Sequence, residues 1–539
     1  MSFISIFDVL GPNMIGPSSS HTAGAAAIAL LARKMMNGDL VRADFTLYGS
    51  FARTYRGHGT DRALLGGIMG FSAADRRIPD SFSIADAQGL SYSFTVNERE
   101  TEIHPNTVDI RMEDSGGRVL TVRGESVGGG KVRVTRIDQV EVDFSGEYST
   151  LIAVQQDKPG VVAHITRCLS EKNVNIAYMK LYREEKGSTA YSIVESDDFL
   201  PEGAVQKIRE NPYVRDVMLI QLQSEKDMGL DKTAGRHEKS DRTGSPHMDV
   251  KINFRNAAEL SALCLKHGLP VSEIMLRREC SSAEVSREDV LARMGRAWEI
   301  MKESARTPIR TPKKSMGGLI GGEAQLLSSH RAQGESVCGD VISRSITYAM
   351  AVLEVNTSMG LIVAAPTAGS SGVVPGVLLA LQEEHGFSDE AVIQALFSAG
   401  AVGYLAMRNA TVAGAVGGCQ AEIGVASAMA ASAAVELMGG TPSQCLGAAS
   451  TVLMNMLGLV CDPIGGLVEA PCQSRNASGA ANALIAAELA LSGVQQPIPF
   501  DEMLEAMYSV GKRLPAELRE TARGGCAATP TACSLCGGC

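Results

Sequence analysis

The sequence predicts a multidomain α+β protein with an N-terminal α/β region, a central βαββαβ unit and an all-α C-terminal half. Three patterns predict this. Helix-like and strand-like segments alternate over residues 1–145, a strand–helix–strand–strand–helix–strand order follows, and from residue 249 onward the segments are helical and rich in Ala, Gly, Met and Leu. A length of 539 residues suits about three or four domains.

The first region, residues 1–145, combines one clear helix with strands. The composition of residues 25–36 predicts a helix, and residues 45–49 and 132–142 read as strands, the latter from the alternation in VRVTRIDQVEV. This α/β region carries three histidines, His21, His58 and His104.

The second region, residues 148–223, begins with a strand and the turn Asp157-Lys158-Pro159-Gly160, which opens a helix over 161–171. A strand over 176–182, another strand, a helix over 203–210 and a strand over 214–221 complete a βαββαβ order. This order and the DKPG turn resemble those of an ACT domain, which implies an amino-acid-binding regulatory module. A structural spacer is the alternative.

Residues 224–248 are polar, of mixed charge and nearly free of core-forming side chains, which predicts a flexible linker. The all-α region that follows, residues 249–525, contains segments typical of buried helices that pack through small side chains, over 391–408, 421–437 and 480–491. The last residues, 526–539, read as an irregular Cys-rich tail.

Composition excludes several classes of protein. The formal net charge of −10 gives no support for nucleic-acid binding. The apolar stretch 361–381 is interrupted by Pro366 and Pro375, so we expect no membrane span. The N-terminus is too short and too poor in basic residues for a signal peptide, so we expect a cytoplasmic protein whose 12 cysteines form no disulfide framework.

Three cysteines of the helical region lie beside Gly, Pro or polar breaks: Cys419 in GGCQAE, Cys461 in VCDPIGG and Cys472 in APCQSRN. Their spacing matches neither a zinc finger nor a ferredoxin run, and buried structural thiols are the simpler interpretation. However, Gly-Gly and X-Pro turns leave room around sulfur. Three thiolates could hold a [4Fe-4S] cluster and leave one iron free as a Lewis acid.

Longer motifs resemble a known family. IGPSSSHTAGAA, GHGTDRALLGG and IHPNT look like the β domain of bacterial iron–sulfur L-serine dehydratases, and EVNTSMGLIVAAPTAGSSGVVPG and VCDPIGGLVEAPCQSRN look like its α domain. The resemblance implies a single-chain β–ACT–α arrangement. It also implies that Cys419, Cys461 and Cys472 are the ligands of a [4Fe-4S] cluster.

The resemblance further implies a tail cysteine that occupies the fourth iron in the absence of substrate. This chain offers four tail thiols, Cys526, Cys533, Cys536 and Cys539. Counting from Gly524-Gly525 favours Cys533, and Cys539 is the alternative. The C-x-x-C-x-x-C spacing of the last three is also a chelating pattern, so a separate tail metal site is a second interpretation.

Removing water from serine requires a base for the Cα proton and a Lewis acid for the hydroxide that leaves. His58, between Gly57 and Gly59, leaves room for a substrate, and the resemblance also makes it the best candidate for the base. His21 and His104 match the family's other active-site histidines, which implies that they orient substrate or relay protons. Satisfied structural histidines are the alternative.

Two loops before apolar helices are suited to a carboxylate, because hydroxyls and free N–H groups gather there. One contains Ser18, Ser19, Ser20 and Thr22; the other runs from Thr367 to Gly372. Simple N-capping is the alternative. The candidate substrate-binding residues are Ser18, Ser19, Ser20, Thr22, Asn106, Thr367, Ser370, Ser371 and Gly372.

Pyridoxal phosphate, the usual cofactor for such a reaction, needs a lysine for its Schiff base. Lys512 is the only lysine after Lys314, so the helical region offers none in its interior and we expect no pyridoxal phosphate.

These patterns lead to a hypothesis: a [4Fe-4S]-dependent L-serine dehydratase that forms pyruvate and ammonia. His58 would take the Cα proton, and the open iron would assist loss of the hydroxyl. Elimination from threonine or cysteine is the nearest alternative, since one methyl group changes binding by only ~1–3 kcal/mol. A non-catalytic amino-acid sensor is another. We expect L-serine as substrate, an amino-acid effector at the ACT-like region, and a homodimer or higher homo-oligomer.

Overall fold

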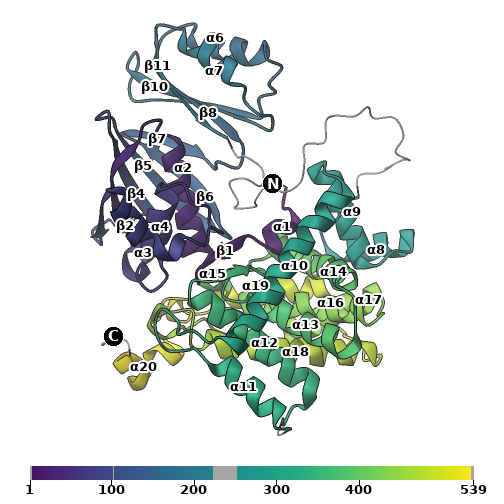
Figure 1. Cartoon of the computed structure of the whole chain (residues 1–539). Coiled ribbons are helices and arrows are strands. Elements are labelled where there is room, and N and C mark those ends of the chain that lie inside the picture. Colours follow the sequence, from purple (N-terminus) through teal and green to yellow (C-terminus); the bar gives the residue numbers. More distant parts are fainter. Residues whose placement is uncertain (1–2, 101, 222–251, 335, 536–539) are drawn as a thin grey trace. The chain divides into compact units, whose positions relative to one another are not determined.

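Figure 1 shows a computed structural model of the chain, which describes residues 3–100, 102–221, 252–334 and 336–535. The described residues form two compact units: residues 20–221 are one, and residues 3–19 together with 252–535 are the other. The expected linker, 224–248, lies outside the described residues.

The unit of residues 20–221 contains a six-stranded sheet in the order β3-β2-β4-β5-β6-β7. β2 and β3 are parallel, and the other neighbours are antiparallel. The strands are β2 (Leu40–Tyr48), β3 (Ser91–Asn97), β4 (Thr107–Asp114), β5 (Val119–Gly128), β6 (Lys131–Ile137) and β7 (Val140–Phe144). The helices of this region are α2 (Ala25–Lys34), α3 (Gly49–Thr54), α4 (Thr60–Ile68) and α5 (Ser81–Gln88).

The helix expected over 25–36 is α2, but two strand predictions need correction. Residues 45–48 form only the second half of β2, and Gly49 already begins α3. The segment 132–142 forms two strands rather than one, β6 and β7, which pair as a hairpin. The chain reverses at Asp138, whose φ is 51°, a conformation that interrupts the strand although the alternating pattern continues.

The second half of the same unit, from β8 to β11, has the predicted βαββαβ order, so that prediction is confirmed. Its sheet has the order β11-β8-β10-β9, antiparallel throughout. Its helices bury an apolar face that includes Val161, Ile165 and Ile208 against the sheet (Figure 1). The elements are β8 (Ser149–Gln156), α6 (Val161–Ser170), β9 (Tyr178–Arg183), β10 (Thr189–Ser196), α7 (Glu202–Arg209) and β11 (Val214–Ile220).

The other unit is helical, as predicted. Its helices are α8 (Ala257–His267), α9 (Val271–Ala283), α10 (Arg287–Arg310), α11 (Glu323–Ala332), α12 (Gly339–Thr357), α13 (Val373–His385), α14 (Asp389–Asn409), α15 (Gly414–Gly417), α16 (Val425–Leu437), α17 (Pro442–Asn455), α18 (Cys472–Leu491), α19 (Phe500–Arg513) and α20 (Pro530–Leu535). α16 is rich in alanine and packs against α14, α17 and α18, because its small side chains allow close approach. α14 is the described helix that is long and apolar enough to cross a membrane, and 72% of that stretch is buried inside the protein.

The tail prediction is partly wrong. Residues 525–535 are not irregular but form a short 3₁₀ turn, Gly525–Ala528, followed by α20. Pro530 starts α20, a position where its missing N–H leaves no helical hydrogen bond unmade.

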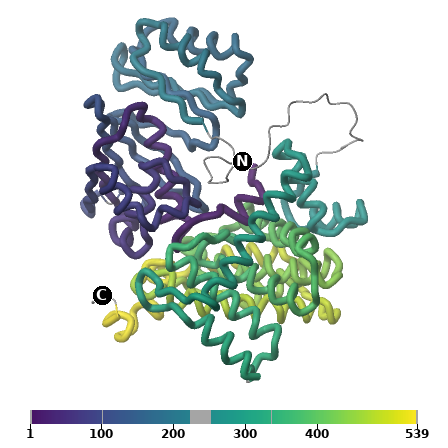
Figure 2. The backbone as a smooth tube through the Cα atoms, viewed as in Figure 1, coloured from purple at the N-terminus to yellow at the C-terminus, as the bar shows by residue number. Residues whose placement is uncertain are grey.

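Residues 3–19 pack with the helical unit, although the sequence suggested a first region of 1–145. α1 (Ile6–Val9) is held by the buried carboxylate of Glu279, which accepts hydrogen bonds from Ser5 Oγ at 2.5 Å and the Ile6 backbone N–H at 2.9 Å. β1 (Asn13–Ile15) then pairs antiparallel with β12 (Leu361–Val363). Figure 2 shows this purple N-terminal segment lying along the green helices. The strand β12 is an addition to the all-helical prediction.

Candidate functional site

The three singled-out cysteines lie at breaks between helices of the helical unit. Cys419 directly precedes a π-helical turn, Gln420–Gly424, Cys461 follows α17, and Cys472 is the first residue of α18. Their side chains are buried, with 2%, 3% and 8% of their surface exposed. π-helical turns are frequent at functional sites, and here one directly follows a predicted ligand.

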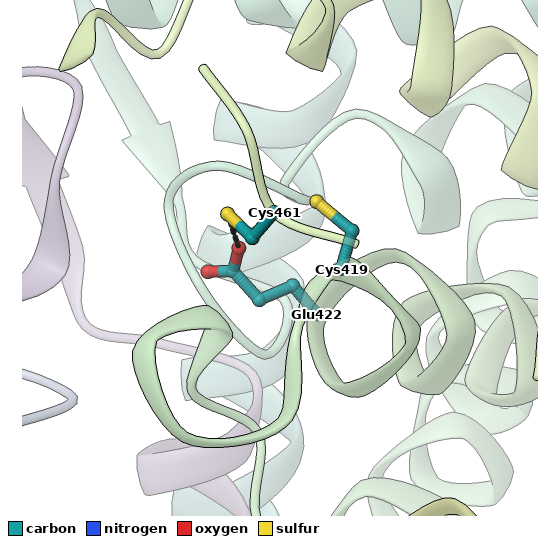
Figure 3. A group of neighbouring side chains, drawn as sticks. All are labelled: Cys419, Glu422 and Cys461. Carbon is teal, nitrogen blue, oxygen red and sulfur yellow. Dashed lines mark hydrogen bonds between the residues drawn. The ribbon is translucent and has the colours of Figure 1, made fainter. Parts of the chain in front are cut away.

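Cys419 and Cys461 lie close together with an acidic neighbour, Glu422. The two sulfurs and a carboxylate oxygen of Glu422 all lie within 4.8 Å of one another. Figure 3 shows these side chains converging, with Cys461 Sγ 4.0 Å from Glu422 Oε2. Thiolates and a carboxylate are ligands that transition metals accept, so this group has the donor chemistry of a metal site.

Cys472 belongs to the same electrostatic environment. Its thiol pKa is raised well above the usual value, first by burial and then by the negative charges of Cys419 and Glu422. In contrast, hydrogen bonds from Cys461 and Arg475, together with the positive charge of Arg475, hold the pKa of Cys419 below its usual value. Cys419 is therefore the thiol of the three that most readily carries negative charge in this structure.

Arg475 supplies the positive charge. Its Nη1 lies 3.5 Å from Cys419 Sγ and donates to the carbonyl of Val460 at 2.9 Å, while Nη2 pairs with Asp462 at 2.7 Å. Asp462 is 2% exposed. One guanidinium from α18 thus joins the segments that carry Cys419 and Cys461, which fixes the spacing of two thiols.

Glycines leave the space that this arrangement needs. A Cβ on Gly414 would lie 2.5 Å from Glu422 Oε2 and 3.1 Å from Cys461 Sγ. Gly418, directly before Cys419, has a φ of 75°, which glycine adopts readily. A side chain at either position would press on the cysteine group or strain the turn that carries it.

The chain beyond α19 also reaches this group. Cys461 donates its N–H to the carbonyl of Leu518 at 2.9 Å and accepts from the N–H of Glu520 at 2.7 Å. The N–H of Cys526 donates to Asp462 Oδ2 at 2.6 Å. Among the described tail cysteines, Cys526 therefore has a backbone hydrogen bond to this group, and its thiol pKa is raised by burial and by a hydrogen bond with Asp462.

Cys533, which the motif count favoured as the tail ligand, lies in α20 and is disulfide-bonded. The alternative, Cys539, and the third residue of the tail chelating pattern, Cys536, lie outside the described residues. The assignment of the tail ligand stays a prediction.

One candidate carboxylate loop, residues 367–372, lies next to the cysteine group, because Thr367 hydrogen-bonds Glu422. Burial raises the pKa of Glu422 well above its usual value, and the hydrogen bond from Thr367 lowers it in part. Ser370 Oγ lies 3.0 Å from Thr367 Oγ1, and Ser371 Oγ donates to the carbonyl of Ala368. The N–H of Gly372 donates to Asn476 Oδ1 at 3.1 Å. The hydroxyls of Thr367, Ser370 and Ser371 therefore hydrogen-bond within the loop, and none of them caps the start of α13.

Within the helical unit, part of the other candidate loop, which contains Ser18 and Ser19, contacts the 367–372 loop. Ser19 Oγ accepts a hydrogen bond from the N–H of Ala368 at 3.0 Å, and the carbonyl of Pro17 accepts from Asn356. Ser18 and Ser19 are both buried. The two sequence motifs that predicted an anion site therefore meet at Ser19, within one unit.

The unit of residues 20–221 holds the predicted histidines. The rings of His21 and His58 meet edge to face with centroids 4.5 Å apart, and His21 Nε2 lies 2.8 Å from Ser50 Oγ. Thr22 Oγ1 donates to the carbonyl of His58 at 2.8 Å. Gly59 follows with a φ of 62° and directly precedes α4, so the chain turns directly after His58.

His104 lies in the loop between β3 and β4, which packs against the start of α3. The carbonyl of Pro105 accepts the N–H of Ser50 at 2.6 Å, and Ser50 is also the partner of His21. Asn106 donates its N–H to His104 Nδ1 at 3.3 Å, and its side-chain Oδ1 is buried without a hydrogen-bond partner among the described residues. Burial holds the pKa of His104 below its usual value.

The pKa of His21 predicts how the stability of its unit depends on pH. Burial, and then the neighbouring His58, hold this pKa well below 6.5. The unfolded chain binds the proton more readily, so the contribution is complete above ~6.5 and is lost as the pH falls toward the folded pKa. We expect thermal unfolding of this unit to shift to lower temperature below pH ~6.5, and His21→Gln to remove up to about 1.4 kcal/mol of that loss per pH unit.

The measurement is calorimetry at several pH values between ~5 and ~8. The control variant is His164→Gln, in α6 of the same unit, which should keep the wild-type slope. Equal pH slopes for the wild type and His21→Gln would contradict the burial argument.

The sequence matches known families over most of its length. Residues 266–527 match the family described as "Serine dehydratase alpha chain", residues 2–91 match "Serine dehydratase beta chain" and residues 149–212 match "ACT domain". The protein named "Probable L-serine dehydratase, alpha chain" from Bacillus subtilis is 46% identical over 278 residues, which are 52% of this chain and 92% of that protein. The chain belongs to the serine dehydratase family.

Two further relatives cover the rest of the chain. The protein named "Probable L-serine dehydratase, beta chain" from Bacillus subtilis is 38% identical over 220 residues, 41% of this chain and 99% of that protein. The protein named "L-serine dehydratase" from Streptomyces coelicolor is 29% identical over 540 residues, 98% of this chain and 100% of that protein. The predicted family and its single-chain β–ACT–α arrangement are confirmed.

Sequence reasoning missed three charged residues of the cysteine group in this serine dehydratase family member: Glu422, Asp462 and Arg475. A signal was available for each, because Glu422 lies three residues after Cys419, Asp462 follows Cys461, and Arg475 lies three residues after Cys472. On a helix, positions i and i+3 share a face. This spacing would have placed Glu422 and Arg475 on the same helix face as Cys419 and Cys472, but no prediction was drawn from it.

Proposed function

We propose that the protein is an iron–sulfur L-serine dehydratase, which converts L-serine to pyruvate and ammonia. The observation that carries this proposal is the group of buried thiols, Cys419, Cys461 and Cys472, held beside the guanidinium of Arg475. The names of the relatives, which are called L-serine dehydratases, support the substrate and the reaction.

The residues fit a [4Fe-4S] cluster bound by three thiolates. The donors are cysteine sulfurs, which such clusters require, and Gly414 and Gly418 leave space around them. Arg475 would offset negative charge on Cys419 and donate to its sulfur. When bound, such a cluster supplies a Lewis acid that makes hydroxide a better leaving group.

His58 is the proposed base for the Cα proton. Its imidazole is 3% exposed and lies against His21, while Thr22 holds its backbone carbonyl. His21, held by Ser50, would fix the orientation of the His58 ring. His104 would act on the substrate or on proton transfer, with Asn106 beside it.

The substrate carboxylate is assigned to the hydroxyl-rich loops. Ser18, Ser19, Ser20 and Thr22 form one of them, and Thr367, Ser370, Ser371 and Gly372 form the other. Ser19 and the 367–372 loop are joined by a hydrogen bond within the helical unit, and one of the two loops would hold the carboxylate. The aminoacrylate product needs no further catalytic group, because it tautomerises and hydrolyses in water.

We also propose that the ACT domain is a regulatory module that binds an amino-acid effector. Such domains bind amino acids, and the domain here has a complete βαββαβ fold with its own apolar core. The protein would act as a homodimer or higher homo-oligomer.

The test is anaerobic purification, reconstitution with iron and sulfide, and assay of pyruvate from serine, threonine and cysteine. We expect serine turnover that rises in proportion to bound iron and sulfide, with threonine and cysteine turned over more slowly. A protein that makes pyruvate without iron would overturn the cofactor assignment. Faster turnover of threonine or cysteine would overturn the substrate, and effector binding without any turnover would favour a sensor.

A further inference from the structure

A polar cavity lies in the helical unit, lined by none of the residues assigned above. It has a volume of about 200 Å³ and lies where α10, α11, α12 and α13 meet. Four arginines line it, Arg306 and Arg310 from α10, Arg331 from α11 and Arg344 from α12, together with Tyr348 and Glu383. Four guanidinium groups around one small space are costly unless negative charge lies among them.

Protein carboxylates offset only part of this positive charge. Arg306 pairs with Glu383 at 2.9 Å, and Arg331 pairs with Asp340 at 2.8 Å. Arg344 contacts Asp340, Glu384 at 3.6 Å and, more distantly, Glu383 at 3.8 Å. Arg310 makes no ion pair within the described part of the chain. Three carboxylates therefore face four arginines, and Glu383 is the one carboxylate that lines the cavity itself.

Hydrogen-bond donors also remain unused. The Nε atoms of Arg331 and Arg344 are buried and have no hydrogen-bond partner among the described residues, although the Nη groups of both side chains are paired. A buried N–H without an acceptor is costly, so buried donors normally meet a protein atom, a water or a ligand.

Both carboxylate oxygens of Glu383 already accept hydrogen bonds from neighbouring side chains. Tyr348 donates its hydroxyl to Glu383 Oε2 at 2.6 Å, while Arg306 occupies Oε1. Burial and this carboxylate raise the pKa of Tyr348 to about 12, so the phenol stays protonated at neutral pH. The carboxylate is thereby satisfied by its own neighbours, and the remaining guanidinium donors stay available.

We propose that this cavity binds the phosphate group of a small phosphoanion. The donors come from three different helices, so they approach from several directions. A tetrahedral phosphate offers acceptors in all of them, whereas a planar carboxylate matches one guanidinium fork. The volume is several times the ~30 Å³ of a water molecule, enough for a phosphate with one substituent.

The experiment is calorimetric titration of the anaerobically purified full chain, carrying its native metal content, with inorganic phosphate, pyrophosphate, glycerol 3-phosphate and succinate. We expect one saturable site per chain for a phosphoanion. Tighter binding of glycerol 3-phosphate than of inorganic phosphate or pyrophosphate would identify a phosphate ester as the source, and the reverse would identify the free anion. Succinate binding at equal affinity would overturn the assignment to phosphate.

Variants locate the site. Arg310→Gln, at an exposed position without an ion pair, and Arg344→Gln should each weaken binding about tenfold or more. Glu383→Gln should strengthen it, since it removes the carboxylate that lines the cavity. Arg255→Gln, an exposed arginine elsewhere in the helical unit, should leave binding unchanged. Absence of saturable binding, or equal affinities for Arg310→Gln and the wild type, would overturn the proposal.

Discussion

Cys461→Ser should abolish serine turnover together with the bound iron and sulfide. Cys461 lies within 4.8 Å of Cys419 and Glu422, is 3% exposed, and is fixed by backbone hydrogen bonds to Leu518 and Glu520. A serine hydroxyl is a poor ligand for iron–sulfur clusters, so we expect loss of the Lewis acid, which is worth several kcal/mol. Since each 1.36 kcal/mol is a factor of ten, the rate should fall by at least about 10³-fold.

The measurements are iron and sulfide content, the visible and EPR spectra of anaerobic protein, and the rate of pyruvate formation. Cys445→Ser is the matched control, because Cys445 is fully buried in α17 and burial raises its pKa well above the usual value. That variant should lose some stability but keep the cluster. A Cys461→Ser protein that retains iron and activity would refute the ligand assignment.

His58→Gln should lower kcat by about 10²–10⁴-fold, the usual contribution of a positioned acid–base group. Glutamine retains polar atoms near the contacts with His21 but cannot take the Cα proton at neutral pH. Because the thiol group lies in the other compact unit, iron content and the cluster spectrum should stay at wild-type values. This combination separates loss of the base from loss of the cofactor.

The rate of Cα proton loss gives a second readout for the same variant. Exchange of the Cα hydrogen of serine for solvent deuterium, followed by NMR, should slow with kcat in His58→Gln. His267→Gln, an exposed histidine at the end of α8, should behave as the wild type. Wild-type turnover in His58→Gln would show that another group is the base.

Much of the fold followed from local patterns. The helix over 25–36 and the central βαββαβ order have periodicity that one segment carries by itself. The hairpin of β6 and β7 was read as one strand because alternation continues through the reversal at Asp138. β12 was missed because three residues are too few for a pattern, and its partner β1 lies far away in the sequence.

The residues of the candidate site were also only partly predictable from the sequence. Cys419, Cys461 and Cys472 were recognisable because glycine and proline surround them and because long motifs match a family. Arg475 and Asp462 were not singled out, since a charged residue in a sequence is usually solvated. Only the structure reveals that Asp462 is 2% exposed and paired with Arg475. The tail was also ambiguous, because four thiols share one short segment and sequence distance does not tell which one packs beside Asp462.

The pairing of β1 with β12 makes the helical unit a discontinuous domain, and the described residues 20–221, which form the other unit, lie between its two parts in the sequence. Asn13 meets its partner Val363 only 350 positions later. At about 5–20 residues per second, ribosomal synthesis would need roughly 20–70 s between the two strands. β1 therefore waits for its native partner while those residues are synthesised, and its apolar residues must stay protected from aggregation until then.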